Sequence, residues 1–138
     1  MGLLPAGVHE ASWDDVMARF GSTERRQVLL AGLFDALRAL GAAGCSRFWL
    51  DGSFVSAIEE PGDYDACWDW SGVEPALLDP LLLDFSQTGR ALMKAKYLGD
   101  LFLSGIEAGS GKPFVEFFQR TRDGQVKGIV LLNPKEVA

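Results

Sequence analysis

Two aspartates, Asp63 and Asp65, stand two residues apart in this 138-residue chain. The residues around them predict a strand. Because side chains alternate between the two faces of a strand, both carboxylates would point the same way, with Cα atoms roughly 6.5–7 Å apart. Two carboxylates this close repel each other unless a cation lies between them. Gly52-Ser53 precedes the pair, and a Gly-Ser turn facing two aspartates suits a site for Mg²⁺ and a nucleotide.

The segments around this pair predict a small fold of the α/β (α+β) class, in which a mixed β-sheet is flanked by helices. Apolar runs and turn signals predict strands at residues 46–50, 64–70, 98–103 and 128–132. Capping residues and helical spacing predict helices at residues 12–20, 23–39 and 88–97. Residues 73–83 are helical or irregular, and residues 114–119 are either a helix or the first arm of a hairpin. We expect one domain over residues 1–138, with a helical segment at 1–44 and the sheet core at 45–138.

The residues around the aspartate pair make it a stronger candidate for a functional site. An Asp-x-Asp sequence alone is common in surface turns. Here it lies on an expected strand whose apolar neighbours, Tyr64, Ala66 and Trp68, alternate with it. Nine residues separate Ser53 from Asp63. The sequence therefore predicts that both carboxylates face a cleft or the edge of the sheet.

The pattern Gly-Ser-x9-Asp-x-Asp, on two successive strands behind a helix, resembles the signature of the nucleotidyltransferase superfamily that includes DNA polymerase β. In size the chain is most similar to the minimal nucleotidyltransferases. It also resembles a bacterial family of uncharacterised single-domain proteins through three short segments, namely Leu4-Pro5, Gly7-Val8-His9 and Lys127-Gly128-Ile129.

The first resemblance implies metal-dependent transfer of a nucleoside monophosphate from an NTP. Gly52 would let the backbone approach the phosphates, and the Ser53 hydroxyl would hold the triphosphate. Asp63 and Asp65 would bind Mg²⁺ or Mn²⁺ as hard oxygen ligands. The superfamily usually supplies a third carboxylate from a later strand. The alternatives, in order of preference, are Asp100, Asp84 and Glu116.

One position departs from the family pattern. Minimal nucleotidyltransferases usually carry an arginine three residues after the motif serine, where it contacts the phosphates. This chain has Ser56 there. Lys94 or Lys96, on the helix before the third expected strand, could supply the positive charge.

Composition excludes some other classes of protein. The net charge of −6 argues against a broad nucleic-acid-binding surface. No apolar stretch is long enough to cross a membrane and no signal peptide is evident, so we expect a cytoplasmic protein. Cys45 and Cys67 are expected to be buried and unpaired. His9, the only histidine, is expected to have a structural role, and no zinc-ligand spacing is present.

Two functional hypotheses remain open. One is a nucleotidyltransferase acting on a protein or RNA acceptor, as similar domains do in toxin–antitoxin or defence loci. The alternative is a catalytically inactive module of the same fold that binds a protein partner or a nucleotide. The aspartate pair favours the enzyme, and the missing arginine favours the inactive module.

Overall fold

The computed structural model describes residues 7–51, 64–104 and 128–137. These residues form five strands, β1 Gly7–Glu10, β2 Phe48–Asp51, β3 Tyr64–Trp68, β4 Gly99–Leu103 and β5 Gly128–Leu132. They also form three α-helices, α1 Trp13–Phe20, α2 Glu24–Ala42 and α3 Gln87–Tyr97. Three 3-10 helices complete the described elements, η2 Pro75–Leu77, η3 Pro80–Leu83 and η4 Pro134–Glu136. The expected α+β class with a mixed sheet is confirmed.

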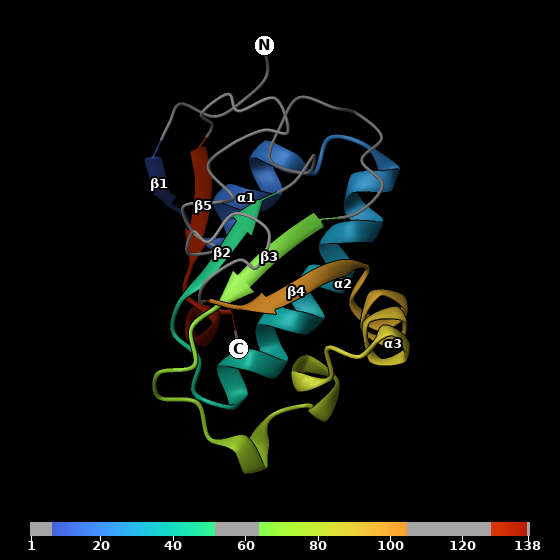
Figure 1. Cartoon of the computed structure of the whole chain (residues 1–138). Helices are drawn as coiled ribbons and strands as arrows, with labels where there is room; N and C mark the ends of the chain where they lie inside the picture. The colour runs from blue at the N-terminus through green and yellow to red at the C-terminus, as the bar shows by residue number, and fades with distance from the viewer. Residues whose placement is uncertain (1–6, 52–63, 105–127, 138) are drawn as a thin grey trace.

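All five strands join one sheet in the order β1-β5-β2-β3-β4 (Figure 1). β2 runs antiparallel to β3 and β5, whereas β1 pairs in parallel with β5, and β3 in parallel with β4. β1 was not predicted, because residues 1–44 were expected to contain only helices. Its four residues carry little local strand signal, and its partner lies more than a hundred residues away in the chain.

Side-chain caps define where the helices begin. Ser12 and Asp15 form a capping box at the start of α1, with the Ser12 hydroxyl accepting from the Asp15 backbone N–H at 3.1 Å. At the start of α2, the Thr23 hydroxyl accepts a hydrogen bond from the Arg26 backbone N–H at 3.1 Å. The helix then continues to Ala42 rather than stopping near Ala39, because Gly41 stays helical. At the start of α3, the exposed Ser86 side chain accepts a hydrogen bond from the Gly89 backbone N–H.

The main core lies between the sheet and the helices, and α1 and α2 lie behind the sheet in Figure 1. Tyr64, Ala66 and Trp68 of β3 are fully buried there, as their alternation predicted. The opposite face of the sheet carries a second, smaller apolar cluster. It comprises Trp49, Cys67 and Ile129, with Phe102 and Leu131 packed against them. The two faces of the sheet are therefore chemically distinct.

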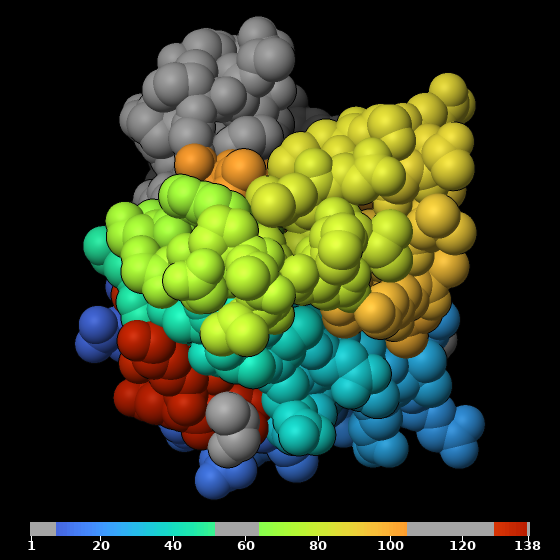
Figure 2. Space-filling view, turned by 90° about the horizontal axis from the view of Figure 1, so that it is seen from below, coloured from blue at the N-terminus to red at the C-terminus, as the bar shows by residue number. Residues whose placement is uncertain are grey.

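The segment between β3 and α3 covers one end of the molecule, where Figure 2 shows it beside α2. Pro75 and Pro80 each begin a 3-10 helix, because proline suits the first turn of a helix and lacks the N–H that would go unpaired there. Asp79 ties this segment to α3. Its Oδ2 accepts hydrogen bonds from Lys96 Nζ at 2.6 Å and from the Tyr97 hydroxyl.

Candidate functional site: a row of aspartates across three strands

Strand register places three aspartates side by side on adjacent strands. Asp51 of β2 is the Cα partner of Asp65 on β3, and Asp65 is in turn the partner of Asp100 on β4. Neighbouring strands lie about 4.8 Å apart, and residues paired across them point to the same face. We call Asp51, Asp65 and Asp100 the aspartate row. Because Tyr64 points into the main core, the row lies on the face of the second apolar cluster.

Asp51, at the end of the row nearest the centre of the sheet, is its most deeply buried member. The Asp100 side chain is 21% exposed and Asp65 is half-buried, whereas Asp51 is only 4% exposed. The Asp51 charge acts on Cys67 of β3. Burial and then this carboxylate raise the pKa of the Cys67 thiol to about 12. The row therefore concentrates carboxylate groups in surroundings that are partly shielded from water.

Two basic side chains of α3 reach the outer end of the row. Arg90 Nη2 lies 3.9 Å from Asp100 Oδ1, and Lys94 Nζ lies 3.8 Å from Asp100 Oδ2. Arg90 and Lys94 are four residues apart, so they share one face of the helix. The Arg90 guanidinium also lies over the Phe102 ring, 5.2 Å from its centroid. Negative charge on the sheet thus meets positive charge on the helix at β4, the last strand in the order of the described sheet.

The structure brings some of the sequence-predicted residues together. Asp65 and Asp100 are register partners, and Lys94 is beside Asp100. Lys96 is not part of this group, because its ammonium binds Asp79. The remaining predicted residues lie outside the described residues, namely Gly52, Ser53, Ser56, Asp63 and Glu116.

Asp84, the second choice for the third carboxylate, has a different setting. Its Oδ1 accepts hydrogen bonds from the backbone N–H and the hydroxyl of Ser86, at 3.1 and 2.6 Å, and these bonds lower the pKa of Asp84. Ser86 in turn caps α3. Asp84 therefore organises the start of the helix, and Asp100 is the later-strand carboxylate that lies beside Asp65.

Sequence reasoning missed Asp51 and Arg90 as members of the group. Asp51 ends an otherwise apolar strand immediately before Gly52, and an acid in that position is the available signal. Arg90 precedes Lys94 by one helical turn, so the choice of Lys94 already implied a basic neighbour on the same face. Neither signal reveals the strand register that brings Asp51 beside Asp65, or the packing of α3 that brings Arg90 beside Asp100.

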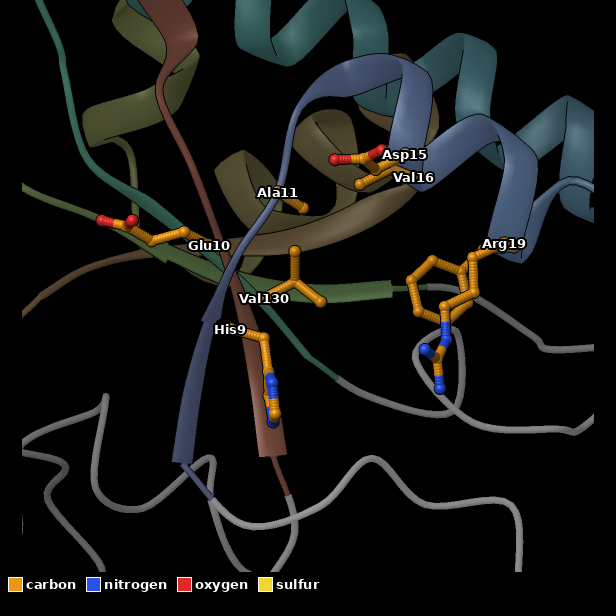
Figure 3. Close-up of a pocket in the computed structure, with 8 residues that line it drawn as sticks. His9, Glu10, Ala11, Asp15, Val16, Arg19 and Val130 are labelled. Atoms are coloured by element: carbon orange, nitrogen blue, oxygen red, sulfur yellow. The ribbon is translucent and has the colours of Figure 1, made fainter.

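A pocket of about 340 Å³ lies elsewhere, between β1 and α1 (Figure 3). His9 and Arg19 point to the same side of it, whereas Glu10 points away and Asp15 belongs to the capping box. Val16 and Val130 form part of its apolar lining. The pocket shares no residue with the aspartate row, and its polar groups do not converge on one point. The row is therefore the stronger candidate site.

The described residues contain no group of three or more His, Cys, Asp or Glu side chains placed to hold a metal ion. Within the described parts of the chain, no helix is long and apolar enough to cross a lipid bilayer. Both described cysteines are free and buried, as expected.

The chain belongs to a family of unknown function, DUF6932, whose model matches residues 1–133. Neither a curated protein nor a solved structure matches the chain. The chemistry of the site must therefore be inferred from its own residues.

Proposed function

We propose that this member of a family of unknown function is a nucleotidyltransferase that uses Mg²⁺ or Mn²⁺ to transfer a nucleoside monophosphate from an NTP. One observation carries the proposal. Asp65 and Asp100 are register partners on adjacent parallel strands, and the strand on the other side of Asp65 ends at Asp51, directly before Gly52-Ser53. The described residues next to the expected motif, Asp51 and Asp65, are thus paired across neighbouring strands, with Asp100 on the following strand.

The chemistry of these residues fits a hard divalent cation. Mg²⁺ is commonly held by one or two carboxylates, and water and substrate phosphates complete its coordination. Asp65 and Asp100 supply two carboxylates from one face, so a protein-only set of three ligands is not required. Asp63, outside the described residues, is the further ligand of the proposal. A bound divalent cation would neutralise charge on the phosphates and on the oxygens that enter and leave.

The residues around this pair have separate roles in the proposal. Asp51 is a buried carboxylate beside Asp65 and strengthens the negative potential that attracts a cation. Lys94, at the outer end of the row, provides positive charge for the phosphates. Gly52 and Ser53 hold the triphosphate through backbone N–H groups and a hydroxyl.

The acceptor in this proposal is a protein or an RNA. With a net charge of −6, the chain would engage RNA only through a local patch, because a wide electrostatic grip on its backbone needs a basic surface. A protein acceptor or a cognate protein partner requires no such patch. A role within a toxin–antitoxin or defence system fits both acceptors.

A catalytically inactive nucleotidyltransferase-fold module is the second candidate, and the ion pairs of Asp100 favour it. Arg90 and Lys94 both neutralise this carboxylate, as in a structural charge cluster between a helix and a strand. Such a module would bind a protein partner or a nucleotide without chemistry.

Thermal unfolding with nucleotides tests the proposal first. The melting temperature should rise when an NTP is added with Mn²⁺ or Mg²⁺, because a ligand that binds only the folded state stabilises it. Asp65→Asn and Asp100→Asn should abolish the rise. Asp84→Asn, which changes an acid outside the row, should retain it. No rise with ATP, GTP, CTP or UTP in the wild-type protein would count against nucleotide binding altogether.

Incubation with NTPs labelled at the α-phosphate then separates the two candidates. The enzyme should transfer label to protein or RNA in a cell extract, and the Asp65→Asn variant should transfer none. A wild-type protein that is stabilised by Mn²⁺ and an NTP but labels nothing would be the inactive module.

A further inference from the structure

We propose that Arg90 binds the β- and γ-phosphates of the nucleotide and so replaces the basic residue that is missing at Ser56. This inference rests on the proposed function and names a residue that recognises its substrate. It starts from the position of Arg90 on α3, where the side chain reaches the face of the sheet that carries the aspartate row.

Two contacts hold the guanidinium in place. Phe102 lies two residues after Asp100 on β4, so both side chains are on the same face of the sheet. Arg90 lies over the Phe102 ring and beside the Asp100 carboxylate at the same time. A guanidinium already held over an aromatic ring loses less conformational freedom when it binds an anion than a side chain in open solvent does. Arg90 is therefore prepared for binding.

The same contacts leave the guanidinium able to take a ligand. The 3.9 Å between Arg90 Nη2 and Asp100 Oδ1 exceeds the length of a direct hydrogen bond. The side chain is 48% exposed, so a ligand can reach the guanidinium from solvent. A guanidinium carries five N–H donors in a planar fork. Phosphate oxygens match this fork, and two parallel hydrogen bonds can form.

The location favours a polyphosphate over a simple carboxylate ligand. A nucleotide with its metal brings a cation to the carboxylates and several phosphate oxygens beyond it. The row ends at Asp100, and Arg90 and Lys94 lie directly past that end. One nucleotide with its metal can thus bind both the carboxylates of the row and the basic side chains of α3. With Asp100 committed to a bound cation, Arg90 and Lys94 would pair with the phosphates instead of with this carboxylate.

Lys96 offers a matched control on the same helix. It is as exposed as Lys94, 53% against 52%, but its ammonium pairs with Asp79 and not with Asp100. Neutralising Lys96 removes the same positive charge from α3 without touching the proposed phosphate contacts.

The test is calorimetric titration with ATP, AMP and inorganic tripolyphosphate in the presence of Mn²⁺. Arg90→Gln should weaken binding of ATP and tripolyphosphate by about tenfold to a hundredfold, the range for lost hydrogen bonds to a charged group. AMP binding should change by much less, because AMP lacks the contacted phosphates. Arg90→Lys should restore part of the loss, since the charge returns without the fork. Lys96→Gln should bind all three as the wild type does.

The outcomes distinguish this inference from the proposed function. If the wild type binds ATP and Arg90→Gln binds it equally well, the inference is wrong and the nucleotide site stands without Arg90. If Arg90→Gln weakens AMP and ATP equally, Arg90 supports the site as a whole and the assignment to the β- and γ-phosphates is overturned. If the wild type binds neither ATP nor tripolyphosphate, both proposals fail together.

Discussion

The hydroxyl of Tyr64 donates a hydrogen bond of 2.9 Å to the backbone carbonyl of Tyr97, joining the start of β3 to the last residue of α3. Tyr64 is fully buried, and its ring lies so close to Gly99 that a Cβ there would be 2.5 Å from it. The residues that follow Tyr64 and Gly99 are Asp65 and Asp100. The contact therefore sets the position of the carboxylates relative to the basic face of α3.

Tyr64→Phe should lower the free energy of unfolding by about 1–3 kcal/mol, because it leaves a buried carbonyl at the end of a helix without its donor. Urea denaturation measures the change. The slope of the unfolding free energy against urea concentration should stay the same if the fold is kept. A loss below about 0.5 kcal/mol would show that another donor reaches the Tyr97 carbonyl.

Gly32→Ala tests the close approach of α2 to α3. A Cβ at Gly32 would lie 2.3 Å from the Tyr97 carbonyl oxygen, so the helices must separate to accept it. At an exposed helical position the same change stabilises by about 0.5–1 kcal/mol. Here we expect a destabilisation of about 1–3 kcal/mol, as overpacking produces. The sign of the change in unfolding free energy, measured by urea denaturation, decides between the two outcomes. A gain in stability would contradict the close approach of α2 to α3.

Asp79→Asn should destabilise the protein by about 1–2 kcal/mol, since it weakens the charge-assisted bonds from Lys96 and Tyr97. Burial opposes ionisation of Asp79, but these bonds outweigh it and lower its pKa. The contribution is therefore present above the unfolded pKa of about 4 and is lost as the pH falls through the lower folded value. The unfolding free energy of the variant should therefore fall less steeply than that of the wild type as the pH is lowered below about 4. Lys96→Gln, which removes the exposed ion pair with Asp79 and the ammonium over the Tyr97 ring, should cost less than about 1 kcal/mol.

Alkaline pH should destabilise the protein through its buried thiols and phenols. Burial is the largest cause that raises the pKa of Cys67, which stands at about 12 against an ordinary 9.0, and burial also raises the pKa of Tyr64. A raised folded pKa gives stability that is present below the unfolded pKa and is lost as pH rises toward the folded value.

Cys67→Ala isolates the contribution of the Cys67 thiol to this loss of stability at alkaline pH. The gap in unfolding free energy between wild type and variant should narrow above about pH 9, by up to about 1.4 kcal/mol for each pH unit. A gap that stays constant from pH 8 to pH 11 would show that Cys67 ionises as easily in the folded protein as in the unfolded one.

Local signals predicted those parts of the fold that local chemistry controls. Ser12 and Thr23 start helices because their hydroxyls meet backbone N–H groups a few residues away. Tyr64, Ala66 and Trp68 share a face because strand geometry has a period of two. Both rules operate within a few residues, so the sequence alone was sufficient for them.

Pairing between distant segments was beyond such rules. β1 exists because β5 offers it a partner, and nothing within residues 7–10 indicates that. Asp51 joins Asp65 through register across the sheet, which the apolar pattern of β2 does not specify. Leu98 adopts a left-handed backbone with φ of 64°, which sequence would assign to glycine. Its side chain packs against the main core, and tertiary contact thus overrides local preference.

The position of β5 in the sheet has a consequence for biosynthesis. β5 lies between β1 and β2, yet it is synthesised after every other described strand. Until it leaves the ribosome, β1 has no neighbour among the described strands, and one side of β2 lacks its partner. The nascent chain can form its helices and the β2–β3–β4 portion early, but closure of the sheet waits for β5. Such late, long-range pairing slows folding and prolongs the exposure of unpaired strand edges to other chains.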